Sequence, residues 1–161
     1  MIRAVLLVAA ASASAAGAQP VPYRPLPPGA PAPLQPVVSI PMLQADLAAK
    51  AGSDTVRFQR DAYAIDPTAQ AVLAIQAQWL IQHPWVRASI EGHADVRQPR
   101  DYALALGERR AAAVRNFLLA QGVPPQQLSI VSWGRERPST PAIHDATWLQ
   151  NSRVVTVLKD F

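Results

Sequence analysis

Two charged side chains in the middle of the chain have the types and spacing to hold a ligand together. Asp95 directly follows a run with strand-like alternation, and Arg110 lies fifteen residues later in a run with helical periodicity. A carboxylate binds an ammonium group, and a guanidinium holds a carboxylate through two parallel hydrogen bonds. At about 100° per helical residue, Arg109 points to solvent and Arg110 lies at the edge of the apolar stripe, within reach of Asp95. We therefore expect Asp95 and Arg110 to face one open cleft that suits a zwitterionic ligand.

Catalytic and metal chemistry find little support among the remaining residues. The chain has no cysteine, which excludes disulfides, thiol catalysis and zinc–thiolate sites. His93 and Asp95 form an H-x-D pair, but His83 and His144 have no matching ligand spacing, so a locally hydrogen-bonded histidine is favoured over a metal ligand. No nucleophile elbow or phosphate-binding loop occurs, and an arginine-paired acid is a poor general acid near neutral pH. We expect a protein that is not an enzyme and needs no cofactor or metal.

The elements that must position this pair follow from periodicity and from the placement of glycine and proline. Asp66 followed by Pro67 marks a helix start, Gly122 marks a helix end, and Pro84 stops the first helix. The predicted strands are 55–59, 86–93, 128–133 and 153–158, and the predicted main helices are 67–83 and 101–121. The order β-α-β-α-β-β predicts an α+β two-layer fold, in which one mixed four-stranded sheet carries two main helices on one face.

The same patterns predict which side chains are buried. In the second strand, Val86, Ala88 and Ile90 alternate with Arg87, Ser89 and Glu91, which is typical of a half-buried strand. Apolar stripes run through Val72, Ile75 and Trp79 on the first main helix, and through Leu104, Ala111, Val114 and Leu118 on the second. We expect the four tryptophans to be mostly core residues, with Trp85 and Trp148 as alternative partner contacts.

The N-terminal part of the chain divides into three short segments. Residues 1–18 have the basic start, short apolar stretch and small-residue end of a cleavable signal peptide, so we expect export to the periplasm. Residues 19–41 hold nine of the sixteen prolines, which predicts an extended linker. Residues 42–51 form a short helical segment that ends before Gly52, and residues 52–161 form the globular domain.

The charge of the chain does not favour nucleic acid as a partner. The formal net charge is +4, with thirteen arginines and two lysines among 161 residues. These cations are scattered rather than clustered, so a nucleic-acid surface is not expected, and binding of another anionic polymer stays an alternative.

Several separated runs resemble the OmpA-like domain family, and most closely its peptidoglycan-associated lipoprotein (Pal) branch. The resemblance covers about residues 52–161 and rests on short motifs that match in order and spacing. These motifs are Glu91-Gly92-His93-Ala94-Asp95, Leu106-Gly107-Glu108-Arg109-Arg110-Ala111, Ser132-Trp133-Gly134-Arg135-Glu136-Arg137-Pro138, Val56-Arg57-Phe58 with Asp61 and Ile65, and Asn151-Ser152-Arg153-Val154.

The resemblance implies non-catalytic binding of the peptidoglycan stem peptide, in many cases through its diaminopimelate residue. It implies a task in cell-envelope integrity or in tethering the outer membrane to the cell wall. Asp95 and Arg110 stand at the positions of the family's ligand-binding acid and arginine. Asp61 stands at a further contact, and the family's pocket lining corresponds to His93, Ala94, Tyr102 and Leu106.

The sequence also departs from the family pattern. Val96 stands in place of an acid, Gln98 and Pro99 in place of a Gly-Thr pair, Ala103 in place of an asparagine, and Ser152 in place of an arginine. Without a cysteine the chain lacks the residue that carries the lipid of Pal, so no covalent lipid anchor is expected. An alternative function follows from these changes: a periplasmic protein-interaction module with a partner of the Tol type, in which peptidoglycan binding is weakened or lost.

Overall fold

The computed structural model describes residues 38–140 and 147–160. The expected signal peptide and the expected linker up to residue 37 lie outside these ranges. The helices are α1 (Ile40–Ala51), α2 (Pro67–Gln82), α3 (Arg100–Ala120), the 3-10 turn η1 (Pro125–Gln127) and α4 (Thr147–Asn151). The strands are β1 (Thr55–Arg57), β2 (Arg87–His93), β3 (Leu128–Gly134) and β4 (Arg153–Lys159).

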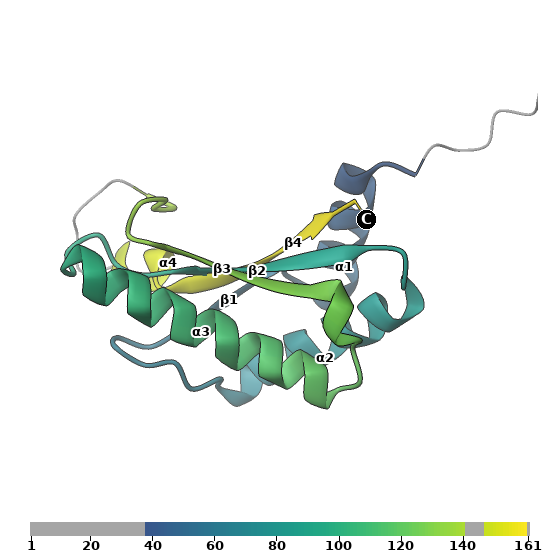
Figure 1. Ribbon diagram of the computed structural model, residues 1–161, viewed down its shortest axis with the longest axis horizontal. Coiled ribbons are helices and arrows are strands. Elements are labelled where there is room, and N and C mark those ends of the chain that lie inside the picture. Colours follow the sequence, from purple (N-terminus) through teal and green to yellow (C-terminus); the bar gives the residue numbers. More distant parts are fainter. Residues whose placement is uncertain (1–37, 141–146, 161) are drawn as a thin grey trace, which may run out of the picture. The chain divides into compact units, whose positions relative to one another are not determined.

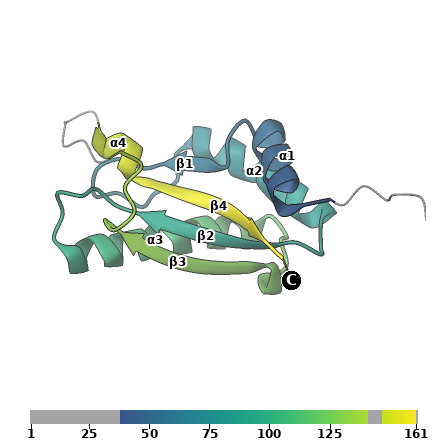
Figure 2. The ribbon, with the colours of Figure 1, turned by 90° about the horizontal axis from the view of Figure 1, so that it is seen from above.

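The four strands form one mixed sheet in the order β1-β4-β2-β3 (Figure 2). β2 and β3 are parallel, whereas β4 lies between β1 and β2 and is antiparallel to both. The helices α2 and α3 lie on the same side of the sheet (Figure 1). This architecture confirms the predicted α+β fold with two main helices on one face of a mixed sheet.

Local sequence signals set most of the element ends. The Asp66 carboxylate accepts a hydrogen bond from the Ala69 N–H at 2.7 Å, and Pro67 occupies the first turn of α2, where no N–H partner is needed. Gly52 ends α1 in the left-handed conformation, with φ of 77°. α1 begins at Ile40, so its first residues fall inside the segment that the sequence assigned to the proline-rich linker.

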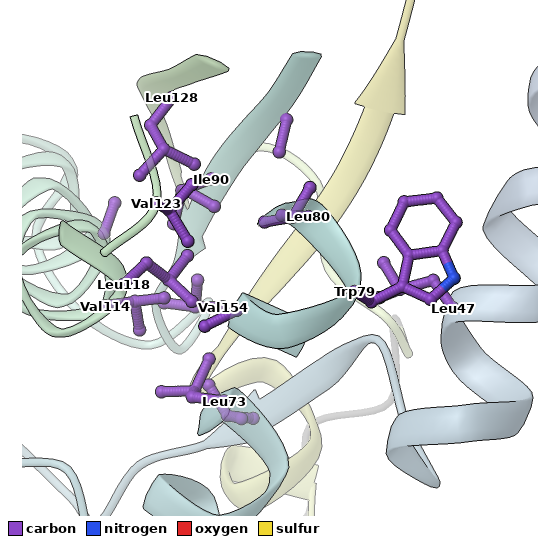
Figure 3. Packing of buried hydrophobic residues seen from close by; sticks show 14 of the residues in the cluster. Leu47, Leu73, Trp79, Leu80, Ile90, Val114, Leu118, Val123, Leu128 and Val154 are labelled. Atoms are coloured by element: carbon purple, nitrogen blue, oxygen red, sulfur yellow. The ribbon is translucent and has the colours of Figure 1, made fainter. Parts of the chain in front are cut away.

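The core lies between the sheet and the helices (Figure 3). Leu73 and Leu80 from α2 meet Val114 and Leu118 from α3, and the strands contribute Ile90 and Val154 among others. Leu47 of α1 packs beside Trp79 on the outer side of α2. Each fully buried side chain of this size contributes roughly 1.5–3 kcal/mol relative to an exposed one, so this cluster holds the sheet and helices together.

Three burial predictions were wrong. Ser89 is fully buried although its alternation predicted an exposed face. Ile75 is 42% exposed and Leu104 is 46% exposed, so the true stripes on α2 and α3 are rotated away from both residues. Among the tryptophans only Trp79 is buried, whereas Trp85 is 61% exposed and Trp133 and Trp148 are half-buried.

The stretch between β3 and β4, to which the sequence patterns assigned no helix or strand, contains the helical turn α4. Its last residue, Asn151, is fully buried, and its side-chain oxygen accepts the N–H groups of Ser139 and Thr140. This amide ties the two described ends of the connection together. Within residues 38–140 and 147–160, no helix has both the length and the apolar character to cross a bilayer.

Candidate functional site

A pocket of about 250 Å³ lies where three strand ends meet. Because β4 is antiparallel to its neighbours, the last residues of β1 and β2 and the first residues of β4 lie at the same end of the sheet. This end of the sheet is surrounded by the segments that follow β1 and β2 and by α4. The residues that line the pocket are Arg60, Asp61, Asp95, Arg97, Gln98, Trp148 and Ser152.

Asp95 lines the pocket, but its partner is Arg97 rather than Arg110. The Arg97 guanidinium donates to both carboxylate oxygens, with the shortest contact at 2.6 Å, and the Arg97 N–H adds a bond of 3.0 Å. Burial raises the pKa of Asp95, but the hydrogen bonds and charge of Arg97 outweigh it and hold that pKa below the usual range. Asp95 is therefore an ionised acid whose counter-ion sits on its own loop.

Arg110 lies beneath the pocket and does not line it. The prediction that Asp95 and Arg110 face one open cleft is therefore wrong. Its guanidinium is fully buried and donates to the carbonyls of Ala62, His93 and Gln59, at 2.8, 3.0 and 3.0 Å. Burial lowers the pKa of Arg110 to about 10, which leaves it charged at neutral pH. These contacts join α3 to the end of β2 and to the segment after β1.

Two glycines explain why Arg110 is so deep. A Cβ on Gly92 would collide with the Gly107 carbonyl, and a Cβ on Gly107 would collide with the Ser132 hydroxyl. Only hydrogen atoms at both positions allow α3 to lie this close to β2 and β3. The close approach carries the next turn of α3, including Arg110, under the end of the sheet.

Asp61 is the second carboxylate of the pocket. It has a φ of 55°, a left-handed conformation that aspartate tolerates better than most residues. Its Oδ1 accepts a hydrogen bond from the Gln98 amide and one from the Tyr102 hydroxyl at 3.3 Å. Both donors are neutral, so Asp61 presents a negative charge that the described part of the chain does not ion-pair.

The other residues predicted from the sequence form the support of the pocket. Ala94 and Leu106 are buried together with Ala103 in a small apolar cluster. His93 is buried, its carbonyl accepts from Arg110, and burial followed by the charges of Arg153 and Arg137 lowers its pKa to about 4. The imidazole is thus neutral at pH 7.

Sequence reasoning thus brought Asp61, Asp95 and Tyr102 to one site but missed the two cations that line it. Arg97 follows Asp95 by two residues, and its N–H bond to the Asp95 carboxylate is the spacing of an Asx turn, a signal that was available. Arg60 adjoins Asp61 and had no comparable signal. In the described ranges, no group of three potential metal ligands occurs.

Comparisons with known proteins identify the family of this chain. The family model described as "OmpA family" matches residues 57–152. The peptidoglycan-associated lipoprotein of Brucella melitensis is 49% identical over 105 residues, which cover 65% of this chain and 62% of that protein. Its counterpart in Agrobacterium fabrum is 45% identical over 118 residues, which cover 73% of this chain and 66% of that protein.

A solved structure gives the same result for the fold. The crystal structure of the peptidoglycan-associated lipoprotein from Burkholderia pseudomallei superposes with a TM-score of 0.66 at 36% identity. The match covers 71% of this chain and the whole of that one. The matched segment spans about three fifths of the Brucella protein's length. The chain is therefore a member of the OmpA family.

Proposed function

We propose that this chain is a periplasmic, non-catalytic peptidoglycan-binding module, which supports envelope integrity by attaching to the stem peptide of the cell wall. The relatives of 45–49% identity are named for their association with peptidoglycan. The observation that carries the proposal is the pocket itself, because it is lined by two carboxylates and two guanidinium groups. Such a set complements a diamino acid such as diaminopimelate, which carries both ammonium and carboxylate groups.

Within this pocket we assign ligand contact to Asp95, Asp61 and Tyr102. Asp95 and Asp61 are the wall carboxylates, and Tyr102 is 46% exposed with its hydroxyl on Asp61. A ligand ammonium would take the place of a neutral donor on Asp61, or share Asp95 with Arg97. Either exchange replaces one set of hydrogen bonds by another and leaves no buried charge unpaired.

We assign Arg110 a different role from the direct contact with a ligand carboxylate that the sequence predicted. Three of its N–H groups are already committed to buried carbonyls, so a ligand would have to break those bonds. We assign Arg110, His93, Ala94 and Leu106 to the support of the pocket from beneath. Arg110 then acts by holding the segment that carries Asp61.

Co-sedimentation with insoluble peptidoglycan tests the proposal. The full chain is expected to pellet with purified sacculi, and Asp95→Ala or Asp61→Ala is expected to weaken binding roughly tenfold, as loss of a charge-assisted contact should. Glu108→Ala removes an exposed carboxylate from α3, away from the pocket, and serves as the matched control. Equal retention of both pocket variants and of the control would contradict the assigned site.

One observation favours a second function, a periplasmic protein-interaction module with a partner of the Tol type. Both pocket carboxylates are already engaged, because Gln98 donates to Asp61 and Arg97 pairs with Asp95. A pocket closed in this way would bind the wall weakly. Capture from periplasmic extract on the immobilised chain separates the two: a specific protein without peptidoglycan fragments favours this second function, and peptidoglycan fragments alone oppose it.

A further inference from the structure

One cation that lines the pocket makes no hydrogen bond or ion pair with the described residues. Within the described ranges, the Arg60 guanidinium makes no hydrogen bond or ion pair; it lies over the ring of Trp148, 5.5 Å from Cζ to the ring centroid, and its charge helps to lower the pKa of Asp95. Arg97 is paired with Asp95, and Arg110 donates to three carbonyls. Of the two guanidinium groups that line the pocket, Arg60 is therefore the one whose five N–H donors are open to a ligand.

Trp148 gives this exposed arginine a defined place. The indole comes from α4, almost ninety residues further along the chain, and is half-buried in the pocket wall. A guanidinium is attracted to the face of an aromatic ring, and stacking leaves its edge N–H groups free to hold a carboxylate. The contact therefore presents Arg60 toward the pocket without using the donors that a ligand needs.

The opposite charge is supplied by the neighbouring residue. Asp61 lines the same pocket and receives hydrogen bonds from the neutral groups of Gln98 and Tyr102. Ser152, a small neutral side chain, lines the same pocket. A pocket of about 250 Å³ suits the end of one amino acid rather than a larger ligand.

We propose that Arg60, stacked on Trp148, is the carboxylate-recognising residue of this pocket and selects ligands whose diamino-acid end carries a free carboxylate rather than an amide. Asp61 receives the ammonium group of the same ligand. The inference rests on the proposed function, since it names which chemical form of the stem peptide the pocket takes. An amide is a weaker partner than the carboxylate, because it is uncharged and offers the guanidinium one acceptor oxygen where the carboxylate offers two.

The test uses two synthetic tripeptides that end in meso-diaminopimelate, one with its free side-chain carboxylate and one with that carboxylate amidated. Calorimetric titration of the full chain is expected to show roughly tenfold tighter binding of the free-carboxylate peptide, the effect of one charge-assisted contact. Arg60→Ala is expected to reduce this ratio to about one by weakening only the free-carboxylate peptide. Arg60→Lys, which keeps the charge but not the planar fork, should retain part of the ratio.

A spectroscopic readout separates recognition from a structural role. The Trp148 indole N–H signal, assigned with Trp148→Phe, should shift when the free-carboxylate peptide is added, and it should not shift in Arg60→Ala. Arg109→Ala, which removes an exposed arginine of α3, is the matched control and should behave as the native chain does.

The outcomes distinguish this inference from the function on which it rests. If the native chain pellets with sacculi but Arg60→Ala keeps the full preference for the free carboxylate, the role of Arg60 is refuted and the proposed function stands. If the native chain prefers neither peptide, selection at this pocket is likewise refuted. If it binds neither peptide and does not pellet with sacculi, both proposals fall.

Discussion

Replacing Arg110 with methionine should cost this domain about 3 kcal/mol of folding stability, because it removes three donors from backbone carbonyls while keeping an unbranched apolar chain in place of the aliphatic part of the arginine. A buried acceptor left without a donor costs roughly 1–3 kcal/mol. The His93 carbonyl lies deepest, whereas water can reach those of Gln59 and Ala62, which belong to a partly exposed segment. Methionine also removes a buried guanidinium charge, which offsets part of this cost. The total therefore stays at about 3 kcal/mol, the lower end of the range expected for three unpaired acceptors.

Urea unfolding followed by circular dichroism at pH 7 measures this difference, with Arg109→Met as the exposed reference. Against a total stability of about 5–15 kcal/mol for a domain of this kind, a loss of 3 kcal/mol shifts the midpoint clearly. Peptidoglycan binding of the variant should recover at low temperature, where the fold is retained. A loss below about 1 kcal/mol together with abolished binding would refute the reasoning, because it would show that Arg110 meets the ligand directly.

Three further outcomes follow from the structure. Burial lowers the pKa of His93 from 6.5 to about 4, so the unfolded chain takes up the proton first as the pH falls. The free energy of unfolding should therefore be unaffected by His93 above pH 6.5 and should decrease by about 2–3 kcal/mol as the pH falls to 4. Urea titrations across this range should show that slope in the native chain and not in His93→Gln. Gly92→Ala should destabilise the domain by at least about 3 kcal/mol, seen as a large drop in Tm, because its Cβ meets the Gly107 carbonyl. Asp66→Ala should cost about 1 kcal/mol in urea unfolding by removing the cap on the Ala69 N–H, and an unchanged midpoint would contradict that assignment.

The element order and most element ends were predictable from the sequence because they depend on local chemistry. Pro67 after Asp66 starts α2, Gly52 ends α1 and Pro84 follows the end of α2, each through the backbone conformation of a few adjacent residues. The periods of apolar residues then separate strands from helices. Together they predicted the mixed sheet with two helices on one face, and they placed Asp95 at a strand end.

The depth and partners of the charged residues were decided by tertiary structure alone. Helical periodicity gives the direction of Arg110 around α3 but not the distance of α3 from the sheet, and the contact between Gly92 and Gly107 sets that distance. With α3 this close, Arg110 meets backbone carbonyls before it can reach Asp95, and Arg97 becomes the partner of that acid.

The pairing of Arg60 with Trp148 could not be predicted for a different reason. The two residues are brought together by the pairing of β1 with β4 and by α4, which packs through the buried Asn151. Neither residue has a periodicity or spacing that refers to the other. The sequence by itself determined which elements form and which charges stand at their ends, because those depend on neighbours in the chain. Only the folded sheet decided which of those charges share a pocket, because that depends on how closely distant elements pack.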